Sequence, residues 1–295
     1  MSSSDCALDL PRRIFDWSCV QHRLRLGERT LIMGVLNVTP DSFSDGGCFK
    51  DEARAVTRAM EMIEEGADLI DVGGESTRPG ADAVDADEER RRVIPVIEQI
   101  CQQSEVPVSI DTTKAEVAKA ALGAGACIVN DVSGAGDPAM ASLVAQTGAG
   151  LVLMHMQGTP RTMQTAPEYQ DVTRDVVGFL DDRIASVVRL GLGREQLCVD
   201  PGIGFGKTLS HNLELLTQLA AFHALGRPVL VGLSRKSFLG QLTGREVGDR
   251  LAGSLAGLVY AITRGAHILR VHDVKESCDT ARIADILVSA EHDRE

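Results

Sequence analysis

Eight short apolar runs recur along this chain, and each of them ends in polar or charged residues. The runs are rich in Val, Ile and Leu, and they alternate with segments in which apolar residues have helical spacing. They cover residues 31–37, 68–75, 106–111, 127–131, 151–156, 197–202, 229–236 and 267–273. Strands that alternate with helices in this way predict right-handed crossovers and a parallel sheet. Eight such units predict an α/β fold of the (β/α)8 TIM barrel type, whose strand ends bring their polar residues to one face.

The segments between these runs predict the helices. In residues 51–67, apolar side chains recur at positions 53, 56, 60 and 63, and Gly66 stands where a C-cap is expected. The predicted helices cover residues 51–67, 87–103, 114–124, 138–147, 171–190, 210–225, 249–264 and 275–289. Because one such barrel takes about 250 residues, we expect a single barrel domain.

The first 29 residues precede the first predicted strand and contain the only tryptophan, Trp17. We therefore predict a short N-terminal extension at residues 1–29 and a barrel domain at residues 30–290. The extension is expected to close the bottom of the barrel as a polar-edged segment or a hairpin. For residues 1–10, a dispensable tail is an equal alternative.

Composition limits the partners and the compartment. The net charge of -12 argues against a general nucleic-acid or anionic-membrane binder, since both need a basic surface. The seven cysteines form no CxxC pair, which favours reduced thiols in the cytoplasm. No apolar stretch reaches about 18 residues and the N-terminus has no signal-peptide pattern, so we expect a cytoplasmic protein without a membrane partner.

Two aspartates and an asparagine end three of the predicted strands. Asp111 and Asp200 close the third and sixth strands, so both carboxylates should point into the barrel mouth. A buried carboxylate needs a donor, which a ligand with several N–H groups would supply. Asn130 ends the fourth strand and can offer a donor and an acceptor to a heterocycle. The alternatives are helix N-caps for the aspartates and a turn residue for Asn130, while Asp131 is expected to be a cap.

Basic residues cluster after the last two strands. Arg235 and Lys236 follow the seventh strand, and Arg270 and His272 lie within and after the eighth. Barrels frequently hold phosphate in these loops, and Arg and Lys together suit an anionic leaving group. Strand alternation places Arg270 and His272 on the same side. The alternative is a chance run of surface charge.

The end of the first strand offers a magnesium ligand. Asn37 supplies a carboxamide oxygen, the hard type of ligand that Mg²⁺ prefers, and nothing in the chain resembles a zinc site. Long loops follow the first, second and fifth strands, at residues 37–50, 73–87 and 157–170. Long loops at this end of a barrel usually shape the active site.

Three other motifs are weak. PGIGFGKT (201–208) nearly matches a P-loop, but Pro201 takes the place of its first glycine. GLSRK lacks the last glycine of a nucleophile elbow, which makes Ser234 a poor nucleophile. His155 stands between two methionines and is interpreted equally well as a ligand or as a pocket wall.

Taken in order across residues 33–274, eight motifs together resemble those of dihydropteroate synthase. They are MGVLNVTPDSFSDGG, IDVGGESTRPG, SIDTTK, IVNDVSG, LMHMQGTP, DPGIGFGK, GLSRKSFLG and RVHDV. Thr113, where the family often has Ser, and the N-terminal extension are departures. The resemblance implies a homodimeric barrel of folate biosynthesis that joins 6-hydroxymethyl-7,8-dihydropterin pyrophosphate to 4-aminobenzoate. The products are 7,8-dihydropteroate and pyrophosphate.

The resemblance also implies a role for each motif residue. Asp111, Asp200 and Lys236 would be catalytic, and the C–O bond would break before the amine attacks. The pterin would bind Asp111, Asn130, Met154, Asp200 and Lys236. The pyrophosphate would lie near Asn37, Thr77, Arg270 and His272, with Mg²⁺ at Asn37. The 4-aminobenzoate, which sulfonamides mimic in the family, would contact Phe43, Arg78, Pro79 and Ser237.

Two alternatives keep the pterin pocket but change the function. The folate-binding barrel of corrinoid methyltransferases would share the pterin carboxylates, yet would give no reason for the loop motifs NVTPDSFSDGG and ESTRPG. An inactive paralogue would bind pterin without turnover.

Overall fold

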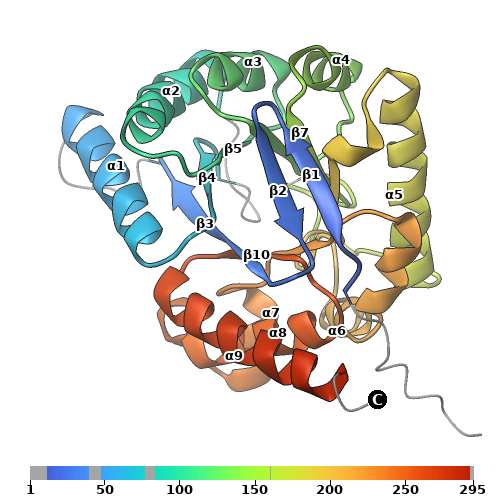
Figure 1. Ribbon diagram of the computed structural model, residues 1–295. Helices are drawn as coiled ribbons and strands as arrows, with labels where there is room; N and C mark the ends of the chain where they lie inside the picture. Colours follow the sequence, from blue (N-terminus) through green and yellow to red (C-terminus); the bar gives the residue numbers. More distant parts are fainter. Residues whose placement is uncertain (1–11, 40–47, 77–83, 160, 293–295) are drawn as a thin grey trace, which may run out of the picture.

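A parallel eight-stranded barrel forms the centre of the computed structural model, which describes residues 12–39, 48–76, 84–159 and 161–292 (Figure 1). The strand order is β8-β7-β6-β5-β4-β3-β10-β9. The strands are β3 (Leu31–Asn37), β4 (Leu69–Gly73), β5 (Val108–Asp111), β6 (Ile128–Asp131), β7 (Gly150–Met154), β8 (Leu197–Asp200), β9 (Leu230–Val231) and β10 (Ile268–Val271). The predicted TIM barrel is thus confirmed.

The barrel closes between β8 and β9 by a minimal contact. A single parallel bridge joins Val199 to Val229, and the Val199 N–H donates to the Pro228 carbonyl at 3.0 Å. The strand predicted over residues 229–236 is much shorter than expected, because the chain leaves the sheet after Val231 and turns at residues 234–235, where Arg235 has a positive φ of 60°. This early turn brings Lys236 to the barrel mouth.

Helices surround the barrel, as Figure 1 shows. They are α1 (Cys48–Glu64), α2 (Ala86–Gln103), α3 (Ala115–Gly123), α4 (Pro138–Thr147), α5 (Val172–Arg189), α6 (Leu209–Thr217), α7 (Ser237–Thr243), α8 (Leu251–Thr263) and α9 (Val274–His292). Three 3-10 helices are η2 (Arg194–Gln196), η3 (Leu219–Leu225) and η4 (Val247–Asp249).

Two helical segments differ from the prediction. The helix expected over residues 210–225 is α6 followed by η3, because the backbone leaves the α conformation at Gln218. The chain also forms α7, which the sequence pattern did not predict. Gly240 reads as a helix breaker in sequence, but here it makes room for the guanidinium of Arg250, and α7 ends at the left-handed Gly244.

Strand alternation separates two parts of the core. Outward side chains such as Ile32, Leu36 and Ile70 pack against the helices. Inward side chains near the strand starts, such as Leu31, Met33 and Leu69, form a second apolar cluster inside the barrel. Farther along the same strands the inward positions become polar, so the barrel interior is apolar at one end and charged at the other.

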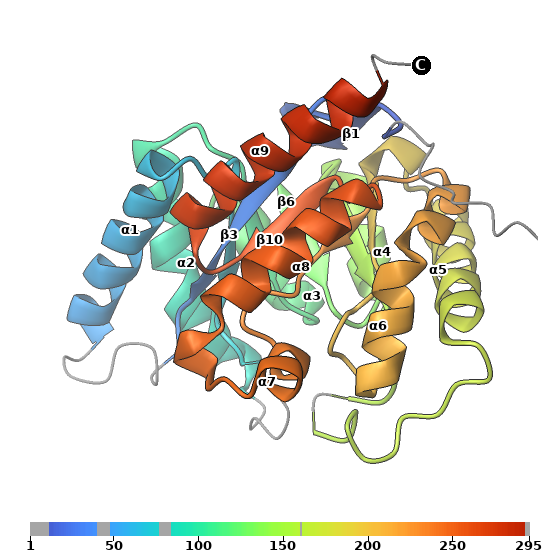
Figure 2. The ribbon, with the colours of Figure 1, turned by 90° about the horizontal axis from the view of Figure 1, so that it is seen from below.

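A β-hairpin covers the apolar end. It consists of β1 (Phe15–Cys19) and β2 (His22–Leu26), and it buries Trp17, Cys19 and Leu26 in the inner cluster. The Trp17 indole N–H donates to the Gln196 carbonyl at 2.8 Å. The hairpin and α7 lie at opposite ends of the molecule (Figure 2). The division into residues 1–29 and 30–290 stays a prediction.

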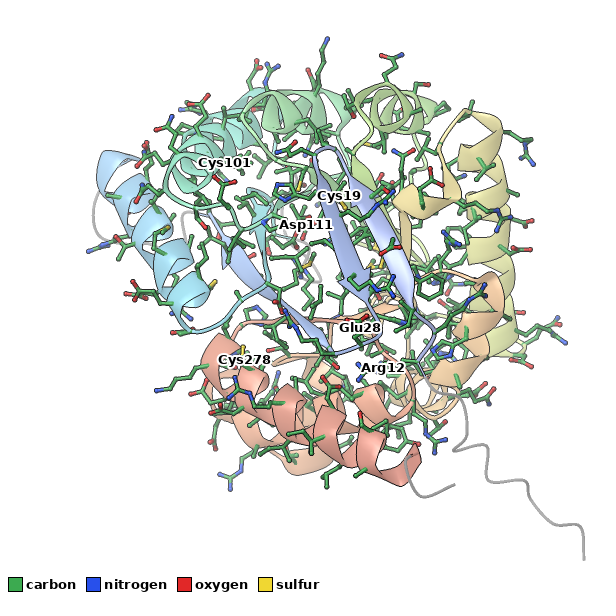
Figure 3. All side chains as sticks on the ribbon, in the orientation of Figure 1. Arg12, Cys19, Glu28, Cys101, Asp111 and Cys278 are labelled. Carbon is green, nitrogen blue, oxygen red and sulfur yellow. The ribbon has the colours of Figure 1, made fainter. Side chains whose placement is uncertain are left out.

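No helix in the described ranges is both long and apolar enough to cross a bilayer. The cysteines whose side chains the structure describes, Cys19, Cys101, Cys127, Cys198 and Cys278, are free thiols. Cys101 lies in the helical layer, whereas Asp111 lies inside the barrel (Figure 3).

Candidate active site

The carboxyl ends of the strands surround a small polar cavity. It is lined by Asp111, Asn130, Val132, Met154, Asp200, Phe205, Gly232, Lys236 and Arg270. The five residues that the sequence assigned to a pterin are therefore together, because all of them lie at or just after strand ends. Free space among these side chains amounts to only about 10 Å³, so a flat ligand has to displace some of them.

One guanidinium joins the acidic groups at the cavity floor. Arg270 donates from Nε to Asp71 Oδ2 at 2.6 Å and from Nη2 to Asp111 Oδ2 at 2.7 Å. Asn130 Nδ2 donates to the same Asp71 oxygen at 3.0 Å. Since Asp71 occupies the amide N–H₂ of Asn130, the amide oxygen of Asn130 is left as the group for a ligand donor.

Two oxygens of this network have no partner. Asp71 Oδ1 and Asp111 Oδ1 are buried, and neither accepts a hydrogen bond from any residue that the structure describes. An unsatisfied buried acceptor is costly. A ligand with N–H donors would remove this cost at Asp111, which lines the cavity.

The electrostatics of Asp111 follow from its burial. Desolvation raises the pKa of Asp111 to about 7, against the lowering effect of Arg270, while the charge of Asp71 raises it further. Asp111 therefore titrates near neutral pH in the free protein. A ligand donor would favour the ionised carboxylate.

Asp200 and Lys236 form the opposite wall of the cavity. Burial raises the pKa of Asp200, and the nearby Lys236 ammonium opposes that shift. Asp200 Oδ1 accepts the Gly202 N–H at 2.7 Å. Lys236 donates to the Ile203 carbonyl and lies 4.4 Å from the centre of the Phe205 ring. Desolvation lowers the pKa of Lys236 to about 8, although Asp200 acts in the opposite direction.

The helix-cap alternative for the aspartates is wrong. The N-cap residue of α3 is Lys114 and that of α6 is Thr208, so neither Asp111 nor Asp200 caps the helix that follows it. Asp131, by contrast, is a loop cap as expected, since its carboxylate accepts the backbone N–H groups of Ser133 and Ala135.

The basic residues are divided between different places. Arg270 lines the cavity, and the His272 ring nitrogen Nδ1 is 3.2 Å from the Ser234 hydroxyl. Arg235 turns away from the cavity and forms a forked ion pair with Asp273. The turn after β9 points Arg235 and Lys236 in different directions.

The remaining predicted residues lie at the rim or outside the described ranges. Asn37 is half-buried at the end of β3, and Ser237 is exposed as the first residue of α7. Phe43, Thr77, Arg78 and Pro79 lie outside the described residues.

Several acidic and basic residues near the mouth were not singled out from the sequence. Asp71 is fully buried. Lys114 donates to Glu75, at the start of the loop after β4, and to the buried Glu89 in α2. The alternation in LIDVG could have identified Asp71, since Leu69, Asp71 and Gly73 share a face. Glu89 lies within a helix, where sequence spacing does not show its partner.

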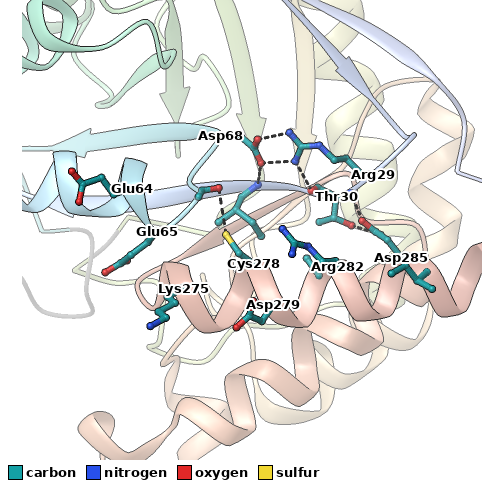
Figure 4. A pocket seen from close by; sticks show the side chains of 14 residues that line it. Arg29, Thr30, Glu64, Glu65, Asp68, Lys275, Cys278, Asp279, Arg282 and Asp285 are labelled. Carbon is teal, nitrogen blue, oxygen red and sulfur yellow. Dashed lines mark hydrogen bonds and ion pairs between the residues drawn. The ribbon is translucent and has the colours of Figure 1, made fainter.

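A larger pocket, of about 770 Å³, lies between the end of α1, the start of β3 and the side of α9 that faces them (Figure 4). Two of its charged groups, Arg29 and Asp68, pair with each other, and Asp285 pairs with Arg12 outside the pocket. Arg29 donates to Asp68 at 2.9 Å, and Asp285 accepts the Thr30 N–H at 2.7 Å. Unlike the barrel mouth, it offers no buried polar atom without a partner in the described residues.

A parallel barrel with two buried aspartates, an asparagine, a lysine and an arginine at its mouth defines the class of pterin-binding enzymes. Residues 33–272 match the family model described as pterin binding enzyme. Dihydropteroate synthase of Escherichia coli (strain K12) is 50% identical over 263 residues, which are 89% of this chain and 93% of that protein. The chain belongs to the dihydropteroate synthase family and is a transferase.

Solved structures agree with this assignment. Xanthomonas albilineans dihydropteroate synthase with 4-aminobenzoic acid has a TM-score of 0.86 and 46% identity, covering 94% of this chain and 98% of that one. The same enzyme in complex with 7,8-dihydropteroate has a TM-score of 0.83 and 42% identity, covering 93% and 98%.

Proposed function

We propose that the barrel mouth joins a dihydropterin pyrophosphate to 4-aminobenzoate and releases pyrophosphate. The observation that carries this proposal is the buried Asp111 Oδ1, which lacks a partner among the described residues and lies in a cavity with Asn130, Asp200 and Lys236. A pterin edge carries the N–H donors that such a cavity needs. Structures of similar synthases with 4-aminobenzoic acid and with dihydropteroate support both ends of the reaction.

The pterin would lie against Met154 and exchange hydrogen bonds with the polar wall. Asp111, Asp200 and the Asn130 oxygen would accept from its N–H groups, and Lys236 would donate to its carbonyl and a ring nitrogen. The Lys236 ammonium lies over the Phe205 ring in the cavity, so the pterin would have to separate these two side chains when it binds. These hydrogen bonds would offset the free energy that it costs to bury the carboxylates of Asp111 and Asp200.

The pyrophosphate would extend toward Asn37, Thr77 and His272, and Arg270 would face it from the cavity floor. Because Arg270 donates to Asp71 and Asp111, it would also hold the Asp111 carboxylate in place for the pterin. The half-buried carboxamide of Asn37 fits Mg²⁺, since it is a hard oxygen donor at the rim. No carboxylate, histidine or cysteine cluster that suits a metal occurs in the described ranges. Mg²⁺ would neutralise charge on the leaving group.

In the reaction, the bond between the pterin methylene carbon and the pyrophosphate oxygen would break first. Asp111, near the resulting pterin cation, would stabilise its charge, and Asp200 and Lys236 would hold the ring. The aniline nitrogen of 4-aminobenzoate would then form the new C–N bond and release a proton. Phe43, Arg78, Pro79 and Ser237 would make the site for this second substrate. The aniline is nucleophilic at neutral pH and requires no dedicated base.

The decisive assay combines the protein with the pterin pyrophosphate, Mg²⁺ and labelled 4-aminobenzoate. We expect labelled dihydropteroate and an equal amount of pyrophosphate. Calorimetric pterin binding without product would instead identify an inactive paralogue. Methyl transfer to a corrinoid protein would indicate the methyltransferase alternative, which the 50% identity to a synthase disfavours.

The exposed faces of α8 and α9 suit a homodimer. Ile283, Ile286 and Leu287 on α9 are each more than half exposed, and Val259 lies on the neighbouring α8. Large exposed aliphatic groups on packed neighbours mark association surfaces. Sedimentation equilibrium should show a dimer, and Ile283→Glu should shift it to monomer; an unchanged dimer would place the interface elsewhere. A cytoplasmic location fits the free thiols and belongs to the same proposal.

A further inference from the structure

Two motifs that have no role in the proposed reaction, PGIGFGKT and LMHMQGTP, are in contact through buried side chains next to the cavity. Lys207, from the glycine-rich segment after β8, is 3% exposed, and His155, which follows β7, is 7% exposed. Lys207 Nζ lies 3.0 Å from His155 Nδ1, 3.3 Å from the His155 carbonyl and 2.9 Å from the Phe205 carbonyl. The three donors of the ammonium thus have three acceptors, and two of these belong to a different loop.

The glycines of this segment explain why the two loops fit so closely. A Cβ on Gly202 would be 1.9 Å from the His155 carbonyl oxygen, and one on Gly206 would be 2.8 Å from the Gln157 carbonyl oxygen. Both glycines have positive φ angles. Unlike a P-loop lysine, Lys207 is buried among groups of the protein itself, at His155 in the loop after β7 and at Phe205 in its own loop.

The state of His155 is consistent with this contact. Burial lowers the pKa of His155 to about 3, and the charge of Lys207 acts in the same direction. The imidazole is therefore neutral. Burial also lowers the pKa of Lys207, to about 7, and a protonated Lys207 would donate to Nδ1 of a ring that carries its proton on Nε2. Its ring is packed edge-on against Phe179, with centroids 4.8 Å apart.

The segment that Lys207 holds also shapes the cavity. Phe205, whose carbonyl Lys207 contacts, lines the cavity with its ring. Ile203 accepts from Lys236, and a Cβ on Gly204 would be 2.9 Å from the Lys236 side chain. Any shift of residues 203–206 would therefore move both Phe205 and Lys236.

We propose that Lys207 is a positioning residue for the pterin site, which ties residues 203–206 to His155 so that Phe205 and Lys236 open and close against a fixed backbone. The proposal rests on the proposed function, because it concerns the same pterin cavity. Lys207 does not touch the substrate in this scheme; it acts through Phe205 and Lys236.

The test compares Lys207→Met with Lys119→Met, an exposed control on α3. Dihydropterin binding to full-length protein is measured by calorimetry, and Tm is measured in parallel. We expect Lys207→Met to weaken dihydropterin binding roughly tenfold, as a misplaced binding group does, and Lys119→Met to change it little. Wild-type protein that fails to bind dihydropterin would refute the proposed function, whereas binding equal in wild type and Lys207→Met would refute this inference alone.

A double-mutant cycle with Phe205→Leu separates positioning from general stability. If Lys207 acts through the Phe205 segment, Lys207→Met should weaken binding less than about twofold in the Phe205→Leu background. Fully multiplicative effects would overturn the proposal. If Lys207→Met does not fold, His155→Gln replaces it in the same cycle, and an unchanged dihydropterin Kd in His155→Gln would overturn the proposal. In wild type, ¹⁵N NMR should show the His155 proton on Nε2.

Discussion

At the scale of single residues, the three carboxylates of the barrel mouth are balanced by two cationic side chains. Arg270 contacts Asp71 and Asp111, while Lys236 lies near Asp200. Asp71 has no place in the proposed reaction, yet it holds both Arg270 and the Asn130 amide. Removing one partner of such a buried network leaves the others unsatisfied, so its effects should reach the pterin site.

Asp71→Asn should lower the pKa of Asp111 below its present value of about 7, because the charge of Asp71 is one of the causes that raise it. The pH dependence of dihydropterin binding should therefore shift to lower pH. Calorimetry over a pH series measures this shift. Asp279→Asn, on the exposed side of α9, is the charge-matched control. An identical profile in Asp71→Asn and wild type would contradict the coupling.

Asp200→Asn should weaken dihydropterin binding by about 1.5–3 kcal/mol, the usual loss for a charge-assisted bond. It should also lower the pKa of Lys236 further below about 8, since Asp200 raises it. The alkaline limb of the rate profile should then move to lower pH. Asp279→Asn again serves as the control, and an unaltered Kd would remove Asp200 from the pterin site.

At the scale of elements, the N-terminal hairpin takes the place of a barrel floor. Trp17 and Cys19 lie so close to the start of β7 that a Cβ on Gly150 would be 2.5 Å from the Cys19 sulfur. The hairpin therefore fits because Gly150 leaves room for it. The polar mouth and the apolar floor are separate layers of the same strands.

Trp17→Ala should destabilise the protein by about 3–5 kcal/mol, because it leaves a cavity in the inner cluster and removes the bond to Gln196. Trp17→Phe should cost less, since most of the apolar contact remains. Urea unfolding measures both changes, with Ile14→Ala, at an exposed position nearby, as the control. Equal midpoints for Trp17→Ala and wild type would mean that the hairpin adds no stability.

At the scale of the whole molecule, one buried histidine joins three segments that are distant in sequence: the N-terminal segment, the start of β9 and the start of β10. His267, fully buried at the start of β10, accepts the Val229 N–H at Nδ1 and lies 3.1 Å from the Arg13 carbonyl at Nε2. These contacts require a neutral ring with its proton on Nε2. Burial lowers the pKa of His267 from 6.5 to about 4.

The contribution of His267 to stability should therefore fall as the pH decreases from about 6.5 to about 4, and His155, whose pKa burial lowers to about 3, acts with the same sign. The unfolded chain takes up the His267 proton first in this window, so protons favour the unfolded state. Asp111, with its raised pKa, has the opposite sign, and only a comparison of variants isolates the histidine. His267→Gln should flatten the pH dependence of the urea midpoint. Parallel curves for His267→Gln and wild type would contradict this assignment.

The sequence alone determined the barrel, because strand and helix periodicities are local and eight repeats leave little choice of topology. It also predicted that Asp111, Asn130 and Asp200 point into the mouth, since each is a polar residue at the end of a strand, whereas Lys236 came to the pterin site only through the family resemblance. The family resemblance named the substrates for the same positions.

Only the tertiary structure decided which side chains are partners. That Arg270 pairs with Asp71 and Asp111 depends on contacts between β10, β4 and β5, which are distant in sequence. Contacts between distant segments also bring Lys207 to His155. They likewise accompany the turn after β9, at which Arg235 and Lys236 point in different directions. Periodicity specifies the face on which a side chain lies, but pairing inside a barrel depends on register and on packing across it, which no local pattern encodes.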